Sequence, residues 1–299
     1  MDFIGQHRIV DFFDNAIKNG RLAHAYCLVG LDGVGKRTLA ELVAGQLLNV
    51  PTDKLGTQPD YFLLKRESDA KTGKLKKEIS IAQTRDLVAR LQNKAWLGGY
   101  RVVVIDEAET MNEESGNALL KLLEEPGGQT VFFLLVTDEE KILLTVRSRC
   151  QLIQMSPVPE KEMHQALVSA GYNADEVQAT VSMSWGRPGR ALNYLRDETI
   201  RQNYIEESQR WKNLQGQPFY QKIKISDDLF GDKTDHIRTR DNLASILDLW
   251  IMQWRAELRE GRDNGPAVCD IIETLAEAKN YLTQNIHPRL LVERAFLKF

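Results

Sequence analysis

Residues 30–36 read GLDGVGK and satisfy the pattern G-x-x-x-x-G-K. The apolar run Ala25–Val29 comes directly before them, and Arg37–Leu48 follows with apolar side chains at helical spacing. A glycine loop between a strand and a helix can cradle phosphates with backbone N–H groups and a helix N-terminus. The stretch therefore predicts a nucleotide-binding loop, and the alternative is a glycine turn with an exposed lysine. The residues expected to hold the phosphates are Gly30, Gly33, Gly35 and Lys36.

One position of this loop departs from the pattern. The Ser or Thr that should follow the lysine and hold Mg²⁺ is Arg37, and Thr38 comes one place later. One residue turns a side chain by about 100° around a helix, so Thr38 does not simply replace the missing ligand, although it stays near the phosphates. We expect ATP to bind weakly or without hydrolysis, and the sequence leaves the role of Mg²⁺ open.

A second motif ends the apolar run Arg101–Ile105 with Asp106 and Glu107. In P-loop ATPases an aspartate at this place lies near Mg²⁺, and a glutamate can polarise the attacking water. Thr137 follows the apolar run Val131–Val136. It is interpreted as a polar sensor beside the phosphates, and the alternative is an ordinary threonine at a strand end.

Strand and helix patterns alternate through the first half of the chain. Further strands are expected at Tyr61–Leu64 and Gln151–Met155. Further helices are expected at Ile9–Lys18, Ile81–Gln92 and Asn112–Glu125, the last with Asn112 as its N-cap. This alternation predicts an α/β P-loop domain over residues 1–158, with a parallel sheet covered by helices on both faces.

The strand signal stops at Pro157-Val158-Pro159. Residues 159–205 are expected to form a small helical lid of three helices, with breaks at residues 171–173 and 186–189. Residues 206–299 are expected to form an all-α domain. Apolar residues recur there at helical spacing from Leu243 to Leu258 and include two tryptophans, which we interpret as core residues instead of base-stacking ones.

Composition limits the class of protein. The formal net charge is −3, so no global positive field recruits nucleic acid or a membrane. The longest purely apolar run, Val131–Val136, is far too short to span a membrane, and the N-terminus lacks a signal-peptide pattern, so we expect a cytoplasmic protein. Three scattered cysteines without a C-x-x-C pair argue against zinc and disulfides. The basic segment Lys65–Glu78, with a turn at residues 72–74, is either a solvated hairpin or a nucleic-acid contact.

Several stretches together resemble a known family. They include FIGQ (residues 3–6), LAHAY (22–26), VVVIDEAE (102–109), NALLKLLEEP (117–126) and the triplet Ser148-Arg149-Cys150. The stretch NIHPRLLVERAFLKF at residues 285–299 extends the likeness to nearly the whole chain. On these motifs the sequence resembles the delta-prime family of bacterial DNA polymerase III, which belongs to the AAA+ clamp loaders.

The resemblance implies an ATPase-type domain, a lid and a C-terminal collar through which five subunits form a ring. The implied partners are the delta and tau/gamma subunits, the sliding clamp and, through the assembled complex, primed DNA. In this family the triplet arginine, here Arg149, reaches into the ATP site of the adjacent subunit as an arginine finger.

Two departures from related subunits bear on activity. Many relatives carry a four-cysteine zinc module, whereas residues 50–60 contain no cysteine, so zinc is not expected. ATP-hydrolysing subunits hold a sensor arginine at the position of Gly189. Arg187 and Arg190 are expected on the helix surface, with approach to a γ-phosphate as the alternative for each. The competing hypothesis is an autonomous, tau/gamma-like AAA+ ATPase in which Lys36 and the acids Asp106 and Glu107 turn over ATP.

Overall fold

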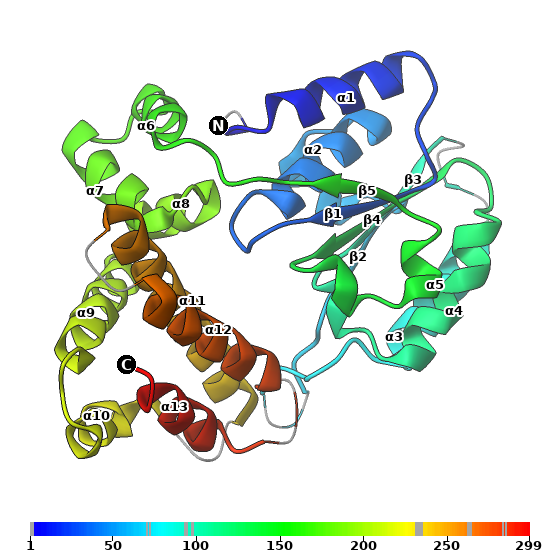
Figure 1. Ribbon diagram of the computed structural model, residues 1–299. Coiled ribbons are helices and arrows are strands. Elements are labelled where there is room, and N and C mark those ends of the chain that lie inside the picture. Colours follow the sequence, from blue (N-terminus) through cyan, green and yellow to red (C-terminus); the bar gives the residue numbers. More distant parts are fainter. Residues whose placement is uncertain are drawn as a thin grey trace. The chain divides into compact units, whose positions relative to one another are not determined.

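A computed structural model shows two compact units (Figure 1). The first unit comprises Met1–Ser68 and Lys76–Arg196, and the second comprises Asp69–Leu75 and Asp197–Phe299. The residues that the structure describes are 3–69, 71, 73–92, 95–96, 99–230, 236–261, 265–282, 284 and 286–299.

The first unit is built on a five-stranded parallel sheet with the order β2-β3-β4-β1-β5. The strands are β1 (Ala25–Val29), β2 (Tyr61–Leu64), β3 (Arg101–Ile105), β4 (Thr130–Val136) and β5 (Gln151–Gln154). β1, β3 and β4 are buried along their whole length, which explains why they are continuous apolar runs. Because neighbouring strands are parallel, the carboxyl ends of β1, β3 and β4 meet at one edge of the sheet. The predicted parallel α/β fold is confirmed.

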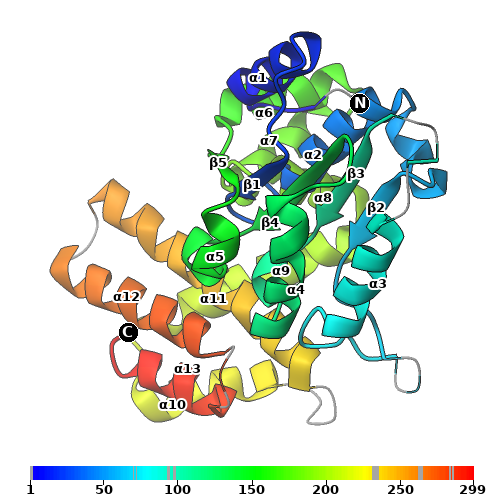
Figure 2. The same ribbon diagram turned by 90° about the vertical axis from the view of Figure 1, so that its right-hand side faces the viewer.

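Helices cover both faces of this sheet. They are α1 (His7–Lys18), α2 (Lys36–Leu48), α3 (Ile81–Gln92), α4 (Glu113–Glu124) and the short α5 (Leu144–Arg147). α1 and α2 pack on one face around Phe13 and Leu39, and α3 to α5 pack on the other around Leu119 and Val146. Figure 2 shows α3 and α4 side by side. Asn112 is the N-cap of α4, as predicted, and its side chain accepts a hydrogen bond from the backbone of Ser115.

Three helices follow the sheet and form the lid: α6 (Glu160–Ser169), α7 (Ala174–Ser184) and α8 (Pro188–Arg196). They enclose an apolar core of their own, in which Ile4 from the N-terminal stretch also packs. The second break between helices is shorter than predicted because α8 begins at Pro188, and proline fits the first turn of a helix. Gly186 in this break has φ +73°, and an added Cβ would lie 2.9 Å from the Val158 carbonyl oxygen.

Apart from its short segment Asp69–Leu75, the elements that the structure describes in the second unit are helices. They are α9 (Glu198–Leu214), α10 (Phe219–Ser226), α11 (His236–Glu260), α12 (Gly265–Tyr281) and α13 (Pro288–Phe296). Trp250 and Trp254 of α11 are buried and pack against aromatic rings, including Phe299, which confirms that they are core residues. None of the helices in the described parts of the chain is long and apolar enough to cross a membrane.

The basic segment forms a turn within its described residues. The backbone N–H of Asp69 donates to the Lys74 carbonyl, at 2.7 Å, and that of Gly73 donates to the Asp69 carbonyl, at 2.8 Å. Thr72, which the sequence placed in the turn, lies outside the described residues. Arg66 departs from the expectation of a solvated hairpin because its side chain is only 11% exposed.

Candidate nucleotide site and arginine triplet

The glycine loop has the expected place and shape. It leaves β1, and the Gly30 N–H donates to the carbonyl of Val136 at the end of β4, at 3.1 Å. Gly33 and Gly35 have φ of 81° and 107°, which residues with a side chain rarely adopt. Lys36 begins α2, and its Nζ donates to the Gly30 carbonyl at 2.5 Å. The ammonium group that would contact phosphates is thus bound to the loop itself.

The lid closes on this loop through two glycines. The Gly189 N–H near the start of α8 donates to the Gly33 carbonyl, at 2.8 Å. A Cβ built on Gly189 would lie 3.1 Å from that oxygen and 3.3 Å from the Gly33 Cα. A side chain at this position requires α8 or the loop to shift by a few tenths of an ångström, so the close contact favours glycine over the arginine that the resemblance places here in ATP-hydrolysing subunits.

The two neighbouring lid arginines differ from each other. Arg187 is only 3% exposed, and its Nε donates to the Ser184 carbonyl, at 3.1 Å. The prediction of a surface arginine is therefore wrong for Arg187, because it lies in the turn that brings α8 to the loop instead of on the outer face of the helix. Arg190 is partly buried, and its backbone nitrogen lies 3.2 Å from the position of a Cβ on Gly33.

The acids after β3 are paired with arginines of the same chain. An Asp106 carboxylate oxygen lies 3.6 Å from Nη1 of Arg37. Glu107 accepts two hydrogen bonds from Arg66, at 2.6 Å and 2.9 Å. Burial raises the pKa of Asp106 above its ordinary 3.8, and the positive charge of Arg37 opposes that rise. The pairing of Glu107 with Arg66 was not predicted, because Arg66 was considered only as part of the basic segment 65–78.

The donor set does not fit Mg²⁺. The hydroxyl expected after the lysine is replaced by a guanidinium, which lies beside the carboxylate that would be the metal's second anchor. Thr38 is exposed one position further along α2. Among the described residues there is no group of three His, Cys, Asp or Glu placed to hold a metal ion. Burial raises the pKa of Cys27 and Cys150 to about 12, so both side chains stay in the thiol form and not in the thiolate form that binds metals.

Thr137 lies at the same edge of the sheet and has a partner of its own. Its hydroxyl donates to a carboxylate oxygen of Glu109, at 2.7 Å, and its backbone N–H donates to the same oxygen, at 2.9 Å. Glu109 belongs to the VVVIDEAE stretch, but its role was not predicted, since only its neighbours matched a catalytic pattern.

The triplet arginine is held against α4. Arg149 follows the C-cap of α5, and its Nε donates to Glu124 at the end of α4, at 3.0 Å. Its Nη2 donates to the same carboxylate oxygen, and its Nη1 donates to the Thr145 carbonyl, at 2.7 Å. The Arg149 side chain is 33% exposed. Glu124 belongs to the NALLKLLEEP motif, on which the family resemblance partly rests. The motif itself did not indicate that Glu124 pairs with Arg149.

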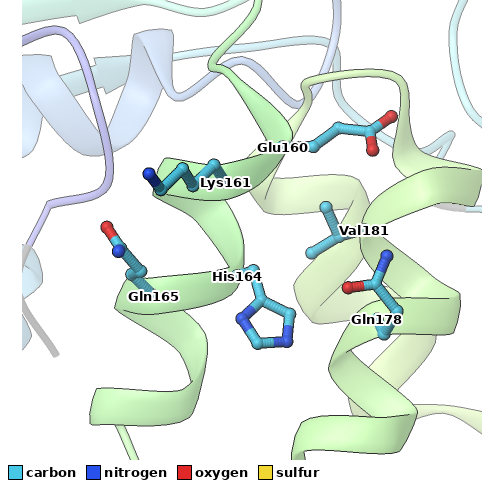
Figure 3. Close-up of a pocket in the computed structure, with 6 residues that line it drawn as sticks. All are labelled: Glu160, Lys161, His164, Gln165, Gln178 and Val181. Atoms are coloured by element: carbon cyan, nitrogen blue, oxygen red, sulfur yellow. The ribbon is translucent and has the colours of Figure 1, made fainter.

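A separate hollow of about 390 Å³ opens on the lid, with side chains from α6 and α7 around it (Figure 3). It contains none of the predicted site residues. Its lining residues are Glu160, Lys161, His164, Gln165, Gln178 and Val181.

A parallel sheet with a phosphate loop after β1, acids after β3 and a helical lid defines the AAA+ class of P-loop proteins. Residues 5–159 match the family described as DNA polymerase III, delta subunit. This match covers a little over half of the chain, so the chain belongs to that AAA+ clamp-loader family.

The similar proteins include two delta' subunits of DNA polymerase III. The one from Pseudomonas aeruginosa is 42% identical over 151 residues, which is 46% of this chain and 44% of that protein. The one from Escherichia coli K12 is 32% identical over 218 residues, covering 65% and 64%. The chain thus matches about half to two thirds of the length of these relatives.

Tau/gamma and gamma-related proteins are also similar to this chain. DNA polymerase III subunit tau/gamma of Haemophilus influenzae is 32% identical over 180 residues, covering 56% of this chain and 25% of that protein. Among solved structures, a DNA polymerase III gamma subunit-related protein of Thermotoga maritima has a TM-score of 0.50 at 14% identity, with 97% of both chains covered. At that identity, the likeness shows the fold alone.

Proposed function

We propose that the chain is a delta-prime-like subunit of a DNA polymerase III clamp loader that helps to load the sliding clamp onto primed DNA. In this role it leaves hydrolysis to its neighbours and supplies Arg149 to the ATP site of an adjacent subunit. The observation that carries the proposal is the internal pairing of its own site. Four groups that would act on ATP are paired within the chain: Lys36, Asp106, Glu107 and Thr137.

The partners of this role are the delta and tau/gamma subunits of a five-membered ring in the cytoplasm. Residues 1–158 act as the ATPase-type domain, the helices α6 to α8 act as the lid, and the helices from α9 onward act as the collar that contacts neighbouring subunits. ATP binds weakly in the chain's own site and with little dependence on Mg²⁺, because the phosphate loop is intact while Arg37 stands where a metal ligand is needed.

Reconstituted clamp loader tests the proposal. Arg149→Ala should leave the ring assembled, because a partly exposed arginine contributes little to stability. It should lower clamp-stimulated and DNA-stimulated ATP hydrolysis by up to about 10³-fold at the one site it serves. Lys36→Ala is the matched variant in the chain's own site, and its effect should be much smaller. A large loss with Lys36→Ala and none with Arg149→Ala would reverse the assignment.

The second candidate is an autonomous AAA+ ATPase. The observation in its favour is that the glycine loop and the two acids lie at the same edge of the sheet, as hydrolysis requires. Phosphate release by the isolated chain decides between the two functions. Turnover that depends on Mg²⁺ and disappears with Glu107→Gln would establish the motor, whereas negligible turnover supports the finger donor.

A further inference from the structure

The contacts of Arg149 engage nearly all of its hydrogen-bond donors. A guanidinium carries five N–H groups. One on Nε and one on Nη2 point to Glu124, and the two on Nη1 are directed at the Thr145 carbonyl and the Ser148 hydroxyl. One N–H on Nη2 is left for another acceptor. An arginine that binds a phosphoryl group uses two parallel N–H groups and its positive charge. Arg149 offers neither while Glu124 holds it.

The position of Glu124 explains why its carboxylate is stabilised by a nearby positive charge. It is the last residue of α4, and the C-terminal end of a helix disfavours negative charge. The guanidinium of Arg149 offsets that unfavourable placement. The pair is nevertheless open to water, with the side chains 33% and 49% exposed, so its strength is modest and a more highly charged anion can displace the carboxylate.

We propose that Glu124 is a positioning residue that sequesters Arg149 until a nucleoside triphosphate on the neighbouring subunit takes the guanidinium over. This inference rests on the proposed role of Arg149 in trans. A triphosphate carries more negative charge than a carboxylate, and it can accept the paired N–H groups that Glu124 occupies. The pair therefore keeps the arginine neutralised in the free subunit and makes its release conditional on a loaded neighbour.

Removing the charge of Glu124 in the reconstituted clamp loader tests the inference. Glu124→Gln keeps the length of the side chain and removes the competing charge, so it should lower the KM for ATP or raise stimulated turnover by up to about fivefold. Glu125→Gln is the matched control, because Glu125 is the next acid, is exposed and has no contact with Arg149 among those observed. This variant should leave the KM for ATP and the stimulated turnover unchanged. In an Arg149→Ala background, Glu124→Gln should have no effect, since both residues act through one contact.

A measurement on the free chain provides a second readout. An arginine-specific dicarbonyl reagent should modify Arg149 several-fold faster in the Glu124→Gln variant than in the unaltered chain. Peptide mass spectrometry measures the rate of this modification. Lower turnover with Glu124→Gln, or equal effects with and without Arg149, would overturn the sequestering role while leaving the arginine finger intact. Full activity of Arg149→Ala would instead overturn the proposed function itself.

Discussion

Replacing Gly189 by alanine tests whether the lid is held against the phosphate loop by a contact that admits a side chain only if the backbone shifts. The added Cβ would lie 3.1 Å from the Gly33 carbonyl oxygen and 3.3 Å from the Gly33 Cα, closer than the 3.4–4 Å of ordinary contact. Both atoms belong to the backbone of a loop that is bonded to β4 and to Lys36. Relief therefore requires α8 to move away from the loop by a few tenths of an ångström.

Three effects set the size of the change. Alanine in α8 favours the helix by up to about 1 kcal/mol relative to glycine. Overpacking costs about 1–3 kcal/mol, and weakening the bond from the Gly189 N–H to the Gly33 carbonyl costs a further 0.5–1.5 kcal/mol or so. The unfavourable effects outweigh the gain in propensity. We expect Gly189→Ala to lower the free energy of unfolding by about 1–2 kcal/mol.

Urea unfolding of the full chain measures this difference, and Gly56→Ala is the matched control. A Cβ at Gly56 meets nothing within 4 Å, and its backbone is outside the left-handed region, so its stability should stay within about 0.5 kcal/mol. Amide exchange at position 189 should also quicken if α8 moves off the loop. A Gly189→Ala chain as stable as the unaltered one, or more stable, would refute the close contact.

Two further predictions concern charge. Burial raises the pKa of Asp106 in the folded chain above 3.8, so at pH values just above 3.8 the folded chain binds more protons at this group than the unfolded chain does. The Asp106 carboxyl therefore lowers the stability of the fold as the pH rises from 3.8 through its folded pKa. Asp106→Asn should therefore gain stability relative to the unaltered chain between pH 4 and pH 7 in urea unfolding; a difference independent of pH would contradict this. Arg101 is 4% exposed and donates to the carbonyls of Leu91 and Gly127, so Arg101→Met should cost about 3–5 kcal/mol, and a loss under 1 kcal/mol would be inconsistent with that role.

The buried strands β1, β3 and β4 could be predicted because burial on both faces requires a continuous run of mostly apolar residues. The apolar runs at residues 25–29 and 101–105 match β1 and β3, while β4 starts one residue earlier than predicted, at Thr130. That residue is buried although polar, because its hydroxyl donates to the Gly127 carbonyl, at 2.8 Å. Periodicity cannot reveal a bond that satisfies a buried hydroxyl.

The pairings within the site could not be predicted from the sequence. Arg66 and Glu107 are 41 positions apart, and Thr137 and Glu109 are 28 apart. Each pair requires the order of strands in the sheet and the direction of a long side chain, neither of which the motifs specify. The motif residues lie at one edge of the sheet, and the motifs left open whether these groups face a ligand or one another.

Whether charged groups face a ligand or one another bears on function. A catalytic site holds charged groups ready for substrate, and keeping them without partners costs stability. In this chain Lys36, Asp106 and Glu107 are each paired with another group of the same chain, although burial still disfavours the charge of Asp106. Arg149 is also paired, and the side chains of Arg149 and Glu124 are 33% and 49% exposed. The proposed role of Arg149 in trans requires a pair of this kind, because a nucleotide on a neighbouring subunit would have to displace the Glu124 carboxylate.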